Sequence, residues 1–144
     1  MAVELREQAF DPWGELARHQ ASDLPAGAFG ATAAFVGTMR DFNADDRVHA
    51  MFLEHYPGMT ERALATIVDD VTAQQGLLAA LVIHRVGDIT PGEPIVLVAV
   101  WSAHRAEAFR ACRDIMEELK ARAPFWKREE RDGGARWVEQ NTPG

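Results

Sequence analysis

Two compact apolar runs separated by a turn constrain this sequence more than any other feature. The runs cover residues 77–86 and 94–101, and the segment between them contains the Pro91-Gly92 pair that is typical of a tight turn. Apolar runs of this length, bounded by turn residues, are typical of β-strands. We therefore expect two neighbouring antiparallel strands here.

Two further segments have the apolar spacing of amphipathic helices. The first follows Pro57-Gly58, ends at Gly76 and carries its apolar residues on one face: Leu64, Ile67, Val68 and Val71. In the second, Ser102 is the expected N-cap and Pro124 stops the helix, while the apolar residues step by three, four and three positions: Phe109, Cys112, Met116 and Leu119. A shorter helix is predicted over 12–20, with Asp11 as its N-cap and Pro12 at its first position.

The remaining elements are expected to be strands and turns. Residues 31–39 and 48–56 suit strands, the opening residues suit an edge strand, and 41–47 is expected to be a mobile polar loop. Residues 125–138 predict a hairpin around Asp132-Gly133-Gly134. This order indicates an α+β fold, with two main helices packed on an antiparallel or mixed sheet and a small C-terminal β hairpin. The length fits one domain over residues 1–144.

Composition limits the functions that suit such a domain. The formal net charge of −7 argues against general attraction to nucleic acid or to an anionic membrane. The first ten residues carry neither a signal-peptide pattern nor a membrane span. A single cysteine, Cys112, excludes an internal disulfide and agrees with a reducing cytoplasm, and its helical position favours a buried apolar role. Any positive site must therefore be local.

Cations cluster at the start of the second main helix. If Ser102 caps it, His104 and Arg105 lie in the first turn, where the helix dipole is positive and disfavours them. A bound anion would relieve this repulsion, because free backbone N–H groups and an Arg fork together bind phosphate or carboxylate well. The alternative is a surface Arg105 paired with Glu107 or another carboxylate.

Two lysines flank Pro124 at the other end of that helix. Lys120 stands at the helix end and Lys127 follows the apolar pair Phe125-Trp126. A buried lysine favours its neutral, nucleophilic form and can transfer protons. Alternatively, Lys120 is an ordinary C-terminal helix lysine, and Lys127 pairs with a nearby glutamate.

Other candidate chemistry is weak. Arg40 ends a predicted strand, a position from which a rigid element can aim a functional side chain. The remaining histidines lack metal-ligand spacing, so we expect no metal site, and no glycine-rich phosphate loop is present.

Taken together, these motifs resemble the large catalytic subunit of molybdopterin synthase. The matching runs are FVGTMR (35–40), LEHYPGMTE (53–61), IHRVG (83–87), PGE (91–93), SAHR (102–105) and LKARAPFWKRE (119–129). They occur in the same order as in the family and span most of the chain from about residue 30 to residue 138. The loop at 41–47 departs from the family pattern because it lacks a glycine near Asp45.

The resemblance implies an enzyme that converts cyclic pyranopterin monophosphate (precursor Z) into molybdopterin by inserting two sulfur atoms. It also implies an α/β-hammerhead-like fold, a homodimer within a heterotetramer, no cofactor, and a small ubiquitin-like sulfur carrier that ends in a Gly-Gly thiocarboxylate. By motif, Lys120 and Lys127 are the catalytic candidates. The substrate-binding set implied by the resemblance is Thr38, Met39, Arg40, His104, Arg105, Lys120, Lys127, Arg128 and Glu129.

Helix length adds a geometric constraint to this set. Arg105 and Lys120 are separated by fifteen positions on one predicted helix, so their Cα atoms should lie about 22 Å apart. One small pterin does not easily reach both. We therefore expect composite sites in an obligate homodimer, in which Arg105 of one chain faces Arg40, Lys120 and Lys127 of its mate.

Two rival functions are also compatible with the sequence. A small α+β domain of this kind can bind an anionic metabolite without changing it, as an anion-sensing or regulatory module. The same cations would also suit an enzyme acting on a phosphate ester, which would release phosphate without a sulfur carrier.

Overall fold

A mixed four-stranded sheet forms the centre of the computed structural model, which describes residues 2–43 and 46–138. Its strand order is β1 (Ala2–Arg6), β5 (Ala79–Arg85), β7 (Pro94–Ser102) and β2 (Ala31–Thr38). β1 runs parallel to β5, whereas β5 with β7 and β7 with β2 are antiparallel. The predicted antiparallel pair of apolar strands is therefore confirmed as β5 and β7.

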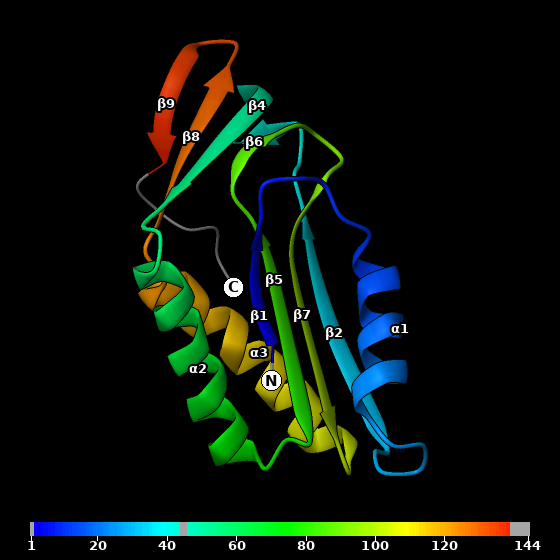
Figure 1. Cartoon of the computed structure of the whole chain (residues 1–144). Helices are drawn as coiled ribbons and strands as arrows, with labels where there is room; N and C mark the ends of the chain where they lie inside the picture. The colour runs from blue at the N-terminus through cyan, green and yellow to red at the C-terminus, as the bar shows by residue number, and fades with distance from the viewer. Residues whose placement is uncertain (1, 44–45, 139–144) are drawn as a thin grey trace.

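Helices cover both faces of this sheet (Figure 1). On one face, α2 (Met59–Gln75) and α3 (Arg105–Arg122) bury their apolar sides against alternate residues of β5 and β7, including Val82 and Val98. On the other face, α1 (Pro12–Asp23) covers the intervening residues, among them Leu97 and Trp101. Because both faces are covered, β7 is buried along almost its whole length.

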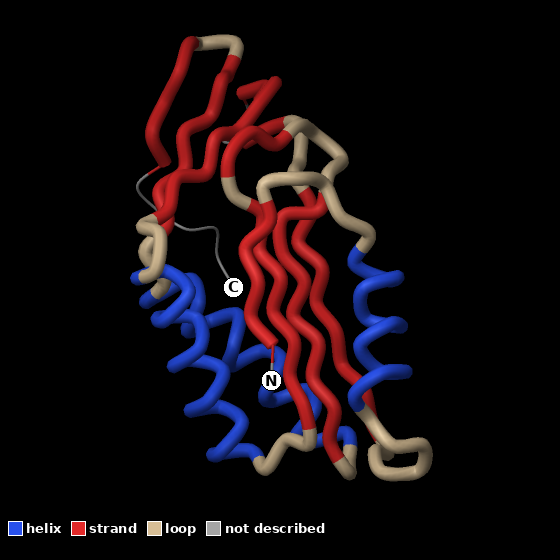
Figure 2. The backbone as a smooth tube through the Cα atoms, in the orientation of Figure 1, coloured by secondary structure: helices blue, strands red, loops and turns tan. Residues whose placement is uncertain are grey.

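A second sheet stands at one end of the first (Figure 2). It contains β3 (Phe42–Asn43), β4 (Asp46–His55), β6 (Gly87–Ile89), β8 (Phe125–Arg131) and β9 (Gly134–Val138). The predicted C-terminal hairpin is confirmed as β8 and β9, and β8 pairs with β4 rather than with the central sheet. A small separate core of Met39, Val48, Met51, Leu53 and Ile89 lies under this second sheet.

The helix boundaries agree with most of the capping signals. Asp11 caps α1 through a hydrogen bond from the Trp13 amide, 3.1 Å long. Gly76 ends α2 in the left-handed conformation at φ 66°, which glycine adopts without strain.

One predicted cap is wrong. Ser102 is the last residue of β7, where it pairs with Ala31, and its hydroxyl donates to the His104 carbonyl over 2.6 Å. The strand continues one residue further than the cap pattern suggested, and the N-cap is His104, so α3 begins at Arg105. The backbone N–H groups of the helix start therefore follow His104 rather than Ser102.

The predicted buried face of α3 also needs a correction. Phe109 is 70% exposed, and the buried residues are Ala108, Ala111, Cys112, Ile115 and Leu119. Small residues let the helix approach the sheet closely, so the alanines occupy the contact that spacing alone gave to Phe109.

Part of the segment that was expected to be a mobile loop is ordered. Phe42 and Asn43 pair with Arg47 and Asp46 as a two-residue strand. Residues 44 and 45 of that loop lie outside the described residues. Within the described ranges, no helix is long and apolar enough to cross a membrane.

Ile115 tests the packing of α3 on the sheet. It is fully buried in the larger core, so Ile115→Ala should lower the free energy of unfolding by about 2–5 kcal/mol through lost burial and a residual cavity. Chemical denaturation measures this change. Arg113→Ala on the exposed side of the same helix is the control and should change stability by under about 0.5 kcal/mol. Equal effects of the two substitutions would contradict the described packing.

Candidate active site

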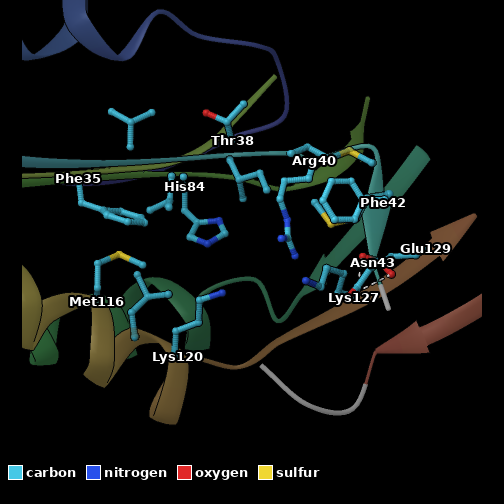
Figure 3. Close-up of a pocket in the computed structure, with 17 residues that line it drawn as sticks. Phe35, Thr38, Arg40, Phe42, Asn43, His84, Met116, Lys120, Lys127 and Glu129 are labelled. Atoms are coloured by element: carbon cyan, nitrogen blue, oxygen red, sulfur yellow. Dashed lines mark hydrogen bonds between the residues drawn. The ribbon is translucent and has the colours of Figure 1, made fainter. Parts of the chain in front are cut away.

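A cavity of about 630 Å³ opens where the two sheets meet the C-terminal half of α3. Its walls come from the end of β2 and the residues after it, from β3, β5, α3 and β8 (Figure 3). The labelled lining residues are Phe35, Thr38, Arg40, Phe42, Asn43, His84, Met116, Lys120, Lys127 and Glu129. Cationic, aromatic and thioether side chains thus face one space.

Lys120 and Lys127 are the only lysines in the sequence, and both line this cavity. Lys120 occupies the last turn of α3 and Lys127 lies near the start of β8. The chain reverses between them at Pro124, whose carbonyl accepts a 3.1 Å hydrogen bond from the buried Thr60 hydroxyl. This link fixes the reversal that brings the two amines together.

The environment of the two lysines opposes their charged forms. Burial lowers the pKa of Lys120 below its ordinary value of 10.5, and the neighbouring Lys127 lowers it further. Burial likewise lowers the pKa of Lys127, with further lowering from Arg40 and Arg131, while Glu129 acts in the opposite direction. The site therefore favours neutral, reactive amines more than a surface lysine would.

Glu129 is the carboxylate that balances this group of cations. It is buried and accepts hydrogen bonds from the Asn43 amide at 3.1 Å and from Arg131 Nε at 2.9 Å. Alternation along β8 places Lys127 and Glu129 on the same face of the strand. The Asn43 contact also ties the segment after Arg40 to that strand.

The segment from Thr38 to Arg40 reaches the cavity from the end of β2. Met39 is held by two backbone hydrogen bonds to the 87–93 turn, one from its amide to Glu93 and one from the Gly92 amide to its carbonyl, each 2.9 Å. Arg40 then points into the cavity, with its guanidinium carbon 5.1 Å from the centre of the Phe42 ring. Because the contact with Phe42 restrains the guanidinium, Arg40 can face an anionic ligand without first ordering a flexible side chain.

Three residues of the predicted site lie outside this cavity. Arg128 occupies the opposite face of β8, with its guanidinium carbon 5.7 Å from the Phe52 ring and 5.9 Å from the Trp137 ring. His104 and Arg105 are exposed at the far end of α3 from Lys120. The structure thus brings Thr38, Met39, Arg40, Lys120, Lys127 and Glu129 together and separates them from the other three.

Sequence reasoning missed several residues that shape the cavity. His84 was considered only as a metal ligand, yet it is buried in the cavity wall. Phe35 and Met116 also line it, although they looked like ordinary core residues. The signal for Phe35 was weak, because one large aromatic among small apolar residues is also typical of a core strand.

His84 has a defined orientation and charge. Its Nδ1 lies 2.8 Å from the Arg85 carbonyl oxygen and must donate, since a carbonyl only accepts. Its ring stacks on Phe125 with centroids 4.2 Å apart. Burial lowers the pKa of His84 to about 4 against the raising effect of this hydrogen bond, and Lys120 lowers it further. The imidazole is therefore neutral near pH 7.

A second cavity of about 540 Å³ adjoins the first. It shares several lining residues with the first, including His84, Lys120 and Lys127, and extends past Phe125 and Trp126. The two lysines therefore stand where the two cavities meet.

This arrangement suits polar group transfer on an anionic ligand. Arg40 and the lysines can stabilise negative charge, and a lysine of lowered pKa can also exchange a proton. Within residues 2–43 and 46–138, no group of three His, Cys, Asp or Glu side chains is placed to hold a metal ion. Burial raises the pKa of Cys112 to about 11, which makes its thiol a poor nucleophile.

Comparison with known proteins identifies the family. The family model described as MoaE protein matches residues 6–122. The molybdopterin synthase catalytic subunit of Pseudomonas aeruginosa is 49% identical over 139 residues, covering 96% of this chain and 91% of that protein. The solved molybdopterin biosynthesis MoaE protein from Burkholderia ambifaria is 42% identical, has a TM-score of 0.80, and covers 96% of this chain and 89% of its own.

A further structure, a complex of subunits 1 and 2 of molybdopterin-converting factor from Helicobacter pylori, has a TM-score of 0.79. It covers 97% of this chain and 92% of its own at 20% identity, and so supports the fold alone. The family match and the identity with the Pseudomonas aeruginosa relative carry the assignment. This chain belongs to the MoaE family, that of molybdopterin synthase catalytic subunits.

Proposed function

We propose that this chain is the sulfur-transferring catalytic subunit of a molybdopterin synthase. It converts cyclic pyranopterin monophosphate (precursor Z) into molybdopterin by inserting two sulfur atoms as a dithiolene. The observation that carries the proposal is that both lysines of the chain face one cavity, where burial lowers their pKa values. Arg40 in the same wall supplies the fixed charge that an anionic pterin needs.

The sulfur donor in this proposal is a separate small ubiquitin-like carrier with a C-terminal Gly-Gly thiocarboxylate. The only cysteine is buried and its pKa is raised, so a second sulfur source suits the chemistry. The Helicobacter pylori structure of the same fold is itself a complex of two subunits, and the proposal extends such a pairing to this chain. We place the reaction in the cytoplasm, where reduced thiols persist.

The roles of the cavity residues follow from their charge and position. Lys120 assists attack of the thiocarboxylate sulfur on the pterin, and Lys127 stabilises developing charge or moves a proton. Arg40, Thr38 and Met39 hold the substrate from the end of β2, while the charge of Glu129 favours the protonated form of Lys127. Arg128 remains a proposed binding residue by motif, although it lies on the other face of β8.

A second chain completes the site in this account. Arg105 and Lys120 are at opposite ends of α3, about 22 Å apart along its axis, and His104 lies beside Arg105. A partner's His104 and Arg105, placed at the mouth of the cavity, would supply the phosphate contacts that one chain lacks. β2 forms one edge of the central sheet and contacts α3. Phe35 on β2 and Phe109 on α3 are exposed, which favours this side of the molecule for a two-fold homodimer.

Turnover by Lys120 variants tests the proposed activity. Purified protein is incubated with thiocarboxylated carrier and the cyclic pterin, and the dithiolene product is measured by mass. Lys120→Ala should abolish product while fold and carrier binding are retained. Lys120→Arg should also lose at least about a hundredfold, because arginine keeps the charge but cannot become neutral.

Near-normal turnover by Lys120→Ala would remove Lys120 from catalysis. If the unaltered protein forms no product, the proposed function is wrong. Release of phosphate without carrier would then favour a phosphate-ester enzyme, and binding without turnover would favour a sensing module.

Mixed dimers test the composite site. Arg105→Ala and Lys120→Ala homodimers should each be inactive, because each lesion affects both sites. After subunit exchange, half of the dimers are mixed and each has one intact site, so activity should recover to about a quarter of the unaltered level. Native mass spectrometry measures the exchange. Absence of recovery despite mixed dimers would place Arg105 and Lys120 in the same chain's site.

A further inference from the structure

His84 is a polar group in the cavity that the proposed mechanism does not use. It lies at the C-terminal end of β5 and is 5% exposed. Figure 3 shows its ring projecting into the space between the β2 residues and Lys120. His84 also lines the second cavity, so its imidazole belongs to the wall where the two chambers meet.

Two contacts fix the orientation of the imidazole. Nδ1 donates to the Arg85 carbonyl over 2.8 Å, and the ring lies nearly parallel to Phe125, with an interplanar angle of 18°. With its proton on Nδ1, a neutral imidazole has its lone pair on Nε2, at the other side of the ring. His84 therefore presents an acceptor nitrogen at a fixed angle.

Acceptors are scarce among the polar side chains of the first cavity. Arg40, Lys120 and Lys127 are donors, and the Glu129 carboxylate is held by Asn43 and Arg131. The neutral acceptors among the described lining residues are Thr38, Asn43 and His84, and of these three His84 also lines the second cavity. Protonation of His84 would add a fourth cation to the cavity, beside Lys120, and the low pKa of the imidazole prevents this.

We infer that Nε2 of His84 is a substrate-recognition group, which accepts a hydrogen bond from a ring N–H or amino group of the bound pterin. This role rests on the proposed function and adds a specificity residue to it. The cations recognise the phosphate and other anionic groups of the ligand. His84 instead recognises the hydrogen-bond donors at the edge of the pterin ring. A ligand of similar charge without such a donor would leave this buried acceptor unsatisfied and bind less tightly.

Three substitutions separate this role from a structural one. His84→Gln keeps an acceptor near the position of Nε2, His84→Asn keeps only a donor near the position of Nδ1, and His84→Phe keeps the ring stack without either. Binding of the cyclic pterin to each protein is measured by calorimetry without the carrier, so that sulfur transfer does not contribute. Thermal unfolding and carrier affinity are measured in parallel as controls.

We expect His84→Phe and His84→Asn to weaken pterin binding by about tenfold, the cost of one lost hydrogen bond in a buried site. His84→Gln should stay within about threefold of the unaltered protein. In ¹⁵N-histidine NMR of the unaltered protein, adding the pterin should shift the Nε2 resonance of His84 and leave its Nδ1 resonance almost unchanged. A purely structural histidine would not show this selectivity.

Unchanged pterin affinity in His84→Phe, or equal losses in His84→Gln and His84→Asn, would overturn the inference. Unchanged pterin affinity in His84→Phe, together with a raised pKa of Lys120 in that variant, would show that His84 acts on the lysine rather than on the ligand. Failure of the inference is distinguishable from failure of the proposed function. In the first case the unaltered protein still makes dithiolene product, and in the second it makes none.

Discussion

The chain reversal at Pro124 is the constraint on which the site depends. Proline cannot continue α3, so the helix ends just after Lys120 and the chain enters β8, which returns Lys127 to the same cavity. The buried Thr60 hydroxyl holds the Pro124 carbonyl, and so anchors the reversal to the start of α2. Two amines that would repel each other in a flexible chain are thereby held close in a partly buried space.

The use of lysine at these two positions has a chemical meaning. Elsewhere in the sequence every side-chain cation other than histidine is an arginine, which stays charged at any ordinary pH. Lysine is the cation whose pKa burial and a like charge can lower, and both effects act on Lys120. Glu129 moderates the same effect at Lys127. The cavity thus combines a permanent charge at Arg40 with two amines able to take or release protons.

Apolar spacing was enough to predict most of the elements, whereas contacts between distant segments were not predictable from it. β5, β7, α2 and the C-terminal hairpin follow from local pattern, because their turn and capping residues are distinctive. The second sheet was missed, since the pairing of β4 with β8 joins segments that are far apart in the sequence. Phe109 was misplaced because spacing cannot show that alanines pack closest. Motif similarity placed the two lysines in one site. Only the alternation of side chains along β8 showed that Arg128 lies on the face opposite Lys127. The assignment of residues 1–144 to one domain stays a prediction.

Direct titration of the two lysines tests the central claim most sharply. Protein labelled with ¹⁵N-lysine contains only two lysine side chains, and Lys120→Arg and Lys127→Arg assign their signals. We predict that both amines titrate below the ordinary value of 10.5, and that Lys127→Arg leaves the pKa of Lys120 lowered, because burial is the larger cause. Titration of both lysines at the ordinary value would contradict the account of a desolvated catalytic pair.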